Sequence, residues 1–338
     1  MPKIPIFEKK NVLVTGGAGF IGSHLCEALL KEAKVICMDD LSGGSLDNID
    51  HLLKERDFIF IKHDVTAPID FSHFPELERF KIQFQGVQEI YHLACPTSPK
   101  DFDAVRLHTL KTNSLGMVNV MELAAQWKAK VFLASSSVVY GARSGKDPFV
   151  SEDYKGVVDH VSARACYDEG KRFAETALTT YRDALGLDIR IARIFRTYGP
   201  RERLRIGEMI PDFIVNALEG KPLEIYGDKN FRTSLCYVSD MVDGIIKLMN
   251  TERDPGPVNL GSDEDMLLSD VAKKIIELTG SASKIVYKPA LLFMSALPLP
   301  HIAKAKDELA WFPVMRLQDG LKAMIEYTRA RKSLLGMK

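Results

Sequence analysis

Short apolar runs of strand length alternate with helix-like stretches between residues 12 and 195. The apolar runs lie at 12–14, 34–38, 58–61, 89–94, 130–134 and 188–194. Helical spacing of apolar residues is found at 23–30, 106–126 and 171–184. Strands that alternate with helices predict an α/β fold with a doubly wound parallel sheet.

The pattern after this region is more mixed. We expect helices at 211–219, 269–279 and 317–331, and a strand at 223–226. No internal repeat, low-complexity segment or clean linker marks a boundary. We therefore expect a first domain over residues 1–195 and a smaller α/β substrate domain over 196–338. The two are expected to be interleaved, with about 237–258 returning to the first domain.

Composition and charge narrow the class of protein. The 338 residues are 46% hydrophobic and 27% charged, which is typical of a soluble globular protein. The 45 basic and 45 acidic residues form no long run of one sign, which argues against nucleic acid or a membrane as partner. The N-terminus does not have the pattern of a signal peptide, and the five cysteines are scattered. These features predict a cytoplasmic protein with reduced thiols.

A glycine-rich turn follows the first apolar run and opens the first predicted helix. Gly17, Gly19 and Gly22 form the pattern G-x-G-x-x-G. In a dinucleotide site the first glycine permits a tight turn, the second lets a pyrophosphate approach the backbone, and the third lets helix and strand pack closely. An ordinary strand-to-helix turn is the alternative, but the strand and helix around the pattern favour a Rossmann-type site. The expected cofactor contacts here are Gly16, Gly17, Gly19, Phe20, Ile21 and Gly22.

An acidic pair ends the second predicted strand. Asp39 lies about 20 residues beyond the glycines, where a carboxylate binds the 2′-hydroxyl of a ribose. Asp39 and its neighbour Asp40 would both repel a 2′-phosphate. We therefore expect NAD as the cofactor rather than NADP.

Polar or stiff segments also follow the other predicted strands. Ligands of an open parallel sheet bind beyond the carboxyl ends of its strands. We expect Asp64 and Val65 to contact the adenine, and Leu93 and Ala94 to lie along the cofactor in a proline-containing loop that extends to residue 99. Any one of these segments after a strand could be an ordinary solvated loop tip, but this alternative explains poorly why so many strands are followed by such segments.

The expected reaction centre combines Tyr167 and Lys171 with Ser136. Tyr167 and Lys171 form Y-x-x-x-K, and this spacing places both side chains on one face of a helix. An ammonium beside a phenol favours the phenolate and lowers a pKa whose reference value is about 10. Tyr167 is then a general base for a substrate hydroxyl, and Ser136 can hydrogen-bond the same oxygen. The alternative is an ordinary amphipathic helix start.

With these residues in place, the sequence resembles the extended short-chain dehydrogenases/reductases of the nucleotide-sugar epimerase/dehydratase type. Within that group it is most similar to the UDP-glucuronic acid decarboxylases. The matching stretches are 12–25, 63–66, 91–99, 165–176, 193–201 and 237–240. The resemblance implies tightly held NAD, proton removal from a sugar C4 hydroxyl by Tyr167, and contact of Lys171 with the nicotinamide ribose.

The resemblance also implies a homodimer through the helices at 106–126 and 171–184. Apolar residues of the first helix, among them Leu107 and Met121, exceed what one face against a sheet requires. The implied partner is a nucleotide-sugar substrate, most simply a UDP-sugar. No metal is expected.

Several positions depart from the family pattern. Val138 stands where decarboxylases of this type have a glutamate, and Arg196 stands where asparagine is usual. Thr233 replaces an arginine, with Arg232 beside it, and a C-terminal arginine is missing from 296–302. Guanidinium groups suit phosphate and carboxylate alike. The expected substrate contacts are Pro96, Ser137, Arg196, Arg203 and Arg232, with Arg205 as a further candidate.

Three functions remain open from the sequence. Loss of carbon dioxide from a 4-keto hexuronate is easy because the acid is a β-keto acid, so decarboxylation is preferred even without the glutamate. The serine-rich stretch 135–137 instead resembles the C4-epimerases. A non-catalytic NAD-binding protein is the third possibility, although such a protein has no need of Tyr167 and Lys171.

Overall fold

The computed structural model describes residues 9–96, 102–143, 147–290 and 296–334. Its centre is a seven-stranded parallel sheet with the strand order β3-β2-β1-β4-β5-β7-β12. The strands are β1 (Lys10–Thr15), β2 (Ala33–Asp39), β3 (Phe58–Lys62), β4 (Glu89–His92), β5 (Lys130–Ser136), β7 (Ile189–Ile194) and β12 (Val258–Leu260). The order reverses between β1 and β4, and this switch point is where such sheets bind ligands.

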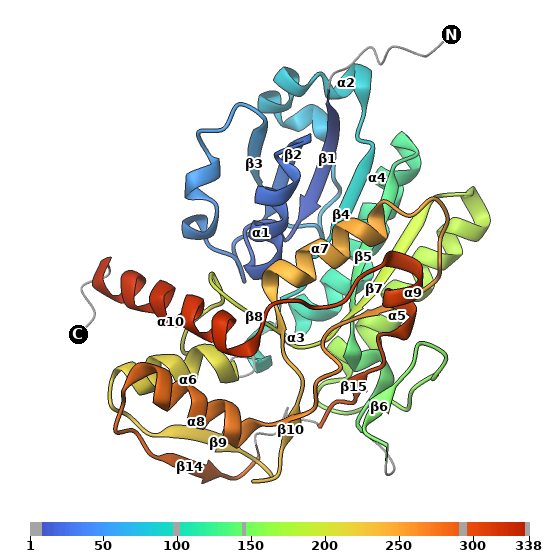
Figure 1. Cartoon of the computed structure of the whole chain (residues 1–338). Coiled ribbons are helices and arrows are strands. Elements are labelled where there is room, and N and C mark those ends of the chain that lie inside the picture. Colours follow the sequence, from blue (N-terminus) through green and yellow to red (C-terminus); the bar gives the residue numbers. More distant parts are fainter. Residues whose placement is uncertain (1–8, 97–101, 144–146, 291–295, 335–338) are drawn as a thin grey trace.

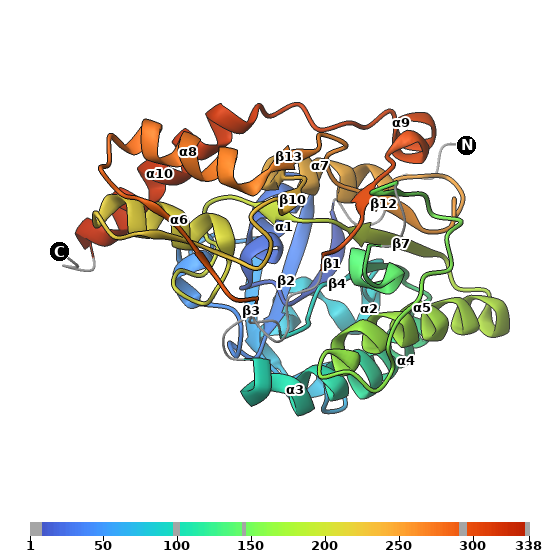
Figure 2. The same cartoon turned by 90° about the horizontal axis from the view of Figure 1, so that it is seen from below.

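Side chains alternate between the two faces of the sheet along each strand. On β1, Val12 and Val14 pack with α1 (Phe20–Leu29) and α7 (Val238–Met249), whereas Leu13 packs on the opposite face. Helices α4 (Met117–Trp127) and α5 (Ala165–Leu185) cover that second face, and α3 (Phe102–Lys111) packs against α5. Figure 2 shows α4 and α5 on one side of the sheet and α7 on the other.

The later part of the chain forms a smaller α/β unit below the sheet in Figure 1. Helices α6 (Met209–Leu218), α8 (Leu268–Thr279) and α10 (Leu317–Leu334) pack near a parallel pair, β9 (Leu223–Tyr226) and β14 (Ile285–Lys288). Short strands pair as β8 (Thr197–Tyr198) with β11 (Cys236–Tyr237), β10 (Arg232–Thr233) with β13 (Met266–Leu267), and β6 (Phe149–Val150) with β15 (Leu299–Pro300). The two remaining helices are α2 (Ile82–Gln85) and α9 (Ala303–Leu309).

The chain crosses between the two parts more than once. After β11, α7 packs against α1, and β12 then joins the end of the large sheet. The segment after α9 is anchored on α7, because the indole of Trp311 donates to the carbonyl of Asp240 at 2.9 Å. The Asp240 carboxylate in turn accepts the backbone N–H groups of Val314 and Met315. These contacts hold the smaller unit against the strand ends.

The predicted parallel α/β sheet is confirmed. The helix expected at 106–126 is also confirmed, but a π-helical turn at Thr112–Gly116 interrupts its α-helical geometry between α3 and α4. Helix α7 was not predicted. Strand β12 is absent from the sequence prediction because its three residues are too few for a pattern. Within the described ranges, no helix is both long and apolar enough to span a bilayer.

Candidate active site

A cavity of about 490 Å³ opens at the carboxyl ends of the central strands. Its walls come from the glycine turn, the strand ends, the start of α5 and the loops of the smaller unit. Every predicted cofactor and substrate residue borders it except Gly17 and the further candidate Arg205. Residues 97–99 of the loop expected along the cofactor lie outside the described residues.

The glycine turn is shaped so that only glycine fits at its key positions. Gly16 has φ +71° and donates its N–H to the carbonyl of Met38 at 2.8 Å. A Cβ on Gly22 would lie 2.1 Å from the carbonyl oxygen of Gly16. Gly17 faces away from the cavity, and a Cβ there would lie 2.6 Å from the sulfur of Cys37. The left-handed conformation of the tight turn is therefore at Gly16, not at Gly17 as the spacing suggests.

The N-terminus of α1 faces the same cavity with its backbone donors uncapped. Gly19 is the N-cap and supplies no side-chain hydrogen bond, and the first turn holds no acidic residue. Free N–H groups and the partial positive charge of a helix end bind phosphate. These open donors, held at the cavity by the close packing of Gly22 on the backbone of Gly16, fit the pyrophosphate of a dinucleotide.

Asp39 ends β2 and holds the glycine turn. Its carboxylate accepts the N–H of Ala18 at 3.0 Å and that of Leu41 at 2.8 Å. Burial raises the pKa of this carboxyl, and hydrogen bonds from the backbone of Leu41, Ala18 and Gly19 oppose the rise. Each carboxylate oxygen keeps a lone pair for a further donor, so the side chain still suits a ribose hydroxyl.

The end of the cavity at which the adenine is expected holds a histidine that the sequence does not reveal. His108 of α3 lies 3.4 Å from the carboxylates of both Asp40 and Asp64. Partial burial raises the pKa of Asp64, but hydrogen bonds from Thr66 and the nearby His108 outweigh it and lower the pKa overall. The three side chains come from segments far apart in the sequence, so no local spacing points to the group.

Ser136, Tyr167 and Lys171 lie together at the switch-point side of the cavity. The Lys171 ammonium donates to the carbonyl of Ala134 at 2.9 Å and is 4% exposed. A hydrogen bond with Ser136 favours the ionised Tyr167 phenol, but burial dominates and raises its pKa well above the usual value. The expected lowering of this pKa is therefore wrong, because burial outweighs the hydrogen bond with Ser136.

The substrate side of the cavity is more mixed in charge than the sequence suggests. Arg196, after β7, faces the carboxylates of Glu202 and Glu208, which oppose the lowering of its pKa by burial. Glu202 is 9% exposed, and its Oε2 has no hydrogen-bond partner among the described residues. Burial raises the pKa of both glutamates. Sequence reasoning missed these two acids because they belong to a stretch that has the composition of a solvated loop.

The other predicted arginines differ in availability. Arg203 borders the cavity and is exposed. Arg232 also borders it, but its Nε donates to the carboxylate of Asp265 at 2.6 Å. Arg205 pairs with Glu219, the residue that follows α6, and does not border the cavity. Arg164, which was not predicted, borders the cavity beside the Tyr167 ring, with 6.0 Å between its guanidinium carbon and the ring centroid.

The chain is similar in sequence to known proteins. Residues 12–261 match the model of the NAD dependent epimerase/dehydratase family. The chain belongs to this family. UDP-glucuronic acid decarboxylase 1 of Danio rerio is 39% identical over 95% of this chain and 73% of its own length. UDP-glucuronic acid decarboxylase 6 of Arabidopsis thaliana is also 39% identical, over 95% of this chain and 89% of its own.

Solved structures of the epimerase/dehydratase family share the fold. UDP-glucuronic acid 4-epimerase from Bacillus cereus, in complex with UDP-glucuronic acid and NAD, is 28% identical with a TM-score of 0.83 over 95% of this chain and 99% of its own. UDP-glucose 4-epimerase from Thermotoga maritima is 26% identical, with a TM-score of 0.82 over 95% and 99%. The resemblance inferred from the sequence is confirmed, and with it an NAD-dependent enzyme of this family.

Proposed function

We propose that this family member is a UDP-glucuronate decarboxylase. The observation that carries the proposal is one cavity that holds a dinucleotide cradle at one end and Ser136, Tyr167 and Lys171 beside it. Curated relatives of this name, 39% identical over 95% of the chain, support the choice of reaction. The division into a cofactor domain (1–195) and a substrate domain (196–338) belongs to the same proposal.

Tyr167 is the proposed general base. Its oxygen takes the proton of the sugar C4 hydroxyl, and Ser136 donates a hydrogen bond to the same substrate oxygen. Because burial raises the pKa of the phenol, the site needs a nearby positive charge to hold the phenolate. Lys171 supplies this charge, and bound NAD supplies the hydride acceptor and donor of the internal redox cycle.

Decarboxylation needs little more from the protein once C4 is a ketone. The C5–C6 bond breaks, its electron pair passes to the C4 carbonyl oxygen through C5, and C6 leaves as carbon dioxide. A proton then returns to C5, so the net change is UDP-glucuronate plus a proton to a UDP-pentose and carbon dioxide. Val138 is 3% exposed and provides no acid or base for these steps, so we expect a slower reaction than in relatives with glutamate.

Arg196 and Arg203 are the proposed contacts with substrate phosphate and carboxylate. They border the cavity without a hydrogen bond or ion pair of their own in the described structure, apart from the longer-range charges of the glutamates near Arg196. Pro96 and Ser137 complete the proposed sugar pocket, and Arg232 can join it by leaving Asp265.

A homodimer in the cytoplasm completes the proposal. Leu107 and Leu110 on α3 are 64% and 46% exposed, and Phe173 on the neighbouring α5 is 45% exposed. Such apolar surface on adjacent helices suits a second copy of the same face. Met121, expected in this surface, is fully buried in the core and does not contribute to it.

C4-epimerisation is the second candidate, and Val138 is the observation that favours it. The test is mass spectrometry of the products from UDP-glucuronate and NAD. A product lighter by one carbon dioxide supports decarboxylation, whereas a product of unchanged mass and new stereochemistry supports the epimerase. If a panel of nucleotide sugars gives neither kind of product and no NADH absorbance, the only one of the three functions left is a non-catalytic NAD-binding protein.

A further inference from the structure

A buried ion pair lies behind the proposed reaction centre. Glu175 is on α5 about one helical turn after Lys171 and two turns after Tyr167, so the three side chains share one face. Its two carboxylate oxygens accept Nε and Nη2 of Arg193 on β7 at 3.0 and 2.8 Å. Both side chains are 13% exposed. A bidentate, largely desolvated pair of this kind fixes geometry as well as charge.

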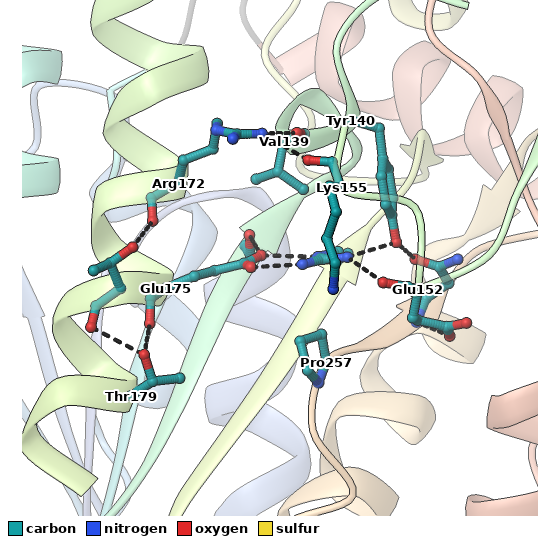
Figure 3. Close-up of polar contacts among 12 residues, drawn as sticks. Val139, Tyr140, Glu152, Lys155, Arg172, Glu175, Thr179 and Pro257 are labelled. Carbon is teal, nitrogen blue, oxygen red and sulfur yellow. Dashed lines mark hydrogen bonds and ion pairs between the residues drawn. The ribbon is translucent and has the colours of Figure 1, made fainter. Parts of the chain in front are cut away.

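The pair joins the helix of Tyr167 to the strand end that carries Ser136. The hydroxyl of Ser135 donates to Glu175 Oε1 at 2.5 Å. Figure 3 shows the Glu175 carboxylate pointing from α5 toward the side on which Tyr140 and Glu152 lie. Displacing Glu175 would therefore disturb the neighbours of both Ser136 and Tyr167.

On the side away from α5, the pair is anchored on the turn Ser137–Tyr140 and the segment that follows it. Arg193 donates through Nη1 to the Tyr140 hydroxyl at 3.0 Å and to the carbonyl of Glu152 at 3.1 Å. Its guanidinium carbon lies 4.8 Å from the Tyr140 ring centroid. From α5, Arg172 donates to the carbonyls of Val139 and Lys155, which holds the same turn (Figure 3). Each of the three guanidinium nitrogens of Arg193 thus has an acceptor inside this network.

Lys171 is free of any carboxylate contact within 4.0 Å in the described part of the chain, although Glu175 is one turn away. A lysine and a glutamate four residues apart on a helix can pair. Here both oxygens of Glu175 are bound by Arg193, and the ammonium is directed to Ala134 instead. Because Arg193 binds the Glu175 carboxylate, that carboxylate is not available to pair with Lys171.

We propose that Arg193 and Glu175 are positioning residues that keep Lys171 available to Tyr167 and the cofactor. The pair fixes the distance between α5 and the end of β5, and Arg193 neutralises a carboxylate that would otherwise attract the ammonium. The proposal rests on the proposed function, in which Tyr167 is the base.

Removing one charge or the other should shift the pKa of Tyr167, and the two shifts should have opposite signs. Without Arg193, the unpaired Glu175 attracts Lys171 and disfavours the phenolate. The acidic limb of the pH profile of kcat, where the rate falls because Tyr167 is protonated, then moves to higher pH. Without the charge of Glu175, Arg193 adds positive potential and the limb moves to lower pH. Other groups near this centre stay in place in both variants; they are His92 on β4, Cys95 after β4, and Arg164 and Asp168 at the start of α5.

The experiment compares the pH dependence of kcat for UDP-glucuronate in R193M, E175Q and the double variant. We expect shifts of about one pH unit, upward in the first and downward in the second. The double variant should return to within about 0.3 units of wild type, because it leaves no net charge. The matched control is Arg182→Met, which removes an arginine of α5 paired with Asp254 away from the cavity and should not move the limb.

A purely structural pair would give a different result. Both single variants would then lose thermal stability, the double variant would be no better, and the limb would stay in place; that outcome overturns the proposal. If R193M does not fold, the downward shift in E175Q alone decides. If wild type turns over no sugar, the proposed function fails separately, and ultraviolet titration of each variant against its Tyr167→Phe counterpart measures the same shifts directly.

Discussion

Replacing Gly22 by alanine should weaken cofactor binding, because the added methyl group has no room in the glycine turn. The added Cβ would lie 2.1 Å from the carbonyl oxygen of Gly16 and 2.9 Å from Cα of Gly17. Both neighbours are backbone, so α1 must move away from β1 to relieve the contact. Overpacking of this kind costs about 1–3 kcal/mol. If the displaced turn carries that strain, the affinity for NAD falls by about 5- to 150-fold, since 1.4 kcal/mol is a factor of ten.

Gly43 provides the matched control. A Cβ on Gly43 would meet no atom within 4 Å, although this residue borders the same cavity. We expect no loss of affinity in G43A. The difference between the two variants isolates the steric effect from a general effect of an added methyl group.

Isothermal titration with NAD measures these affinities, and circular dichroism melting checks that each variant is folded. If G22A and G43A bind NAD equally well while both are folded, the close approach of α1 to the turn is not what shapes the cofactor site. If G22A is folded but less stable, the rise of its melting midpoint on addition of NAD, compared with the rise in G43A, still reports the difference in binding.

The remaining predictions concern chemistry and assembly. Tyr167→Phe keeps the ring but removes the base, so turnover should fall about 10²–10⁴-fold while titration shows NAD binding unchanged; retained turnover would exclude this residue as the base. Val138→Glu should preserve or raise release of carbon dioxide from UDP-glucuronate. If a folded variant releases none, the protein is not a decarboxylase that merely lacks the glutamate of its relatives. Leu107→Asp combined with Leu110→Asp should give monomers by light scattering, and an unchanged dimer would exclude the α3 surface.

The sheet could be predicted because each of its strands but one is an apolar run long enough to stand out. The π-helical turn Thr112–Gly116 could not, since the apolar spacing continues through it and only the backbone hydrogen bonds reveal it. The three residues of β12 carry too little pattern. Local spacing thus predicts an element when its length exceeds a few residues and its side chains face the core.

The site was predictable where one segment carries the chemistry. The glycine turn and the pair Tyr167 and Lys171 each fall within a short stretch, whereas the group around His108 forms only in the fold. Among the arginines near residue 200, sequence alone does not separate Arg203, at the cavity, from Arg205, which pairs with Glu219. The pKa of Tyr167 could not be foreseen either, because it depends on burial.

Each outer strand of the large sheet has a backbone group bound by a side chain. On β3, the guanidinium of Arg79 donates to the carbonyl of Phe58. On β12, the N–H of Asn259 donates to the carboxylate of Glu152 at 2.8 Å. An exposed edge strand can recruit a strand from another molecule and start aggregation. A side chain that occupies one of these backbone groups stands in the way of strand addition at that position.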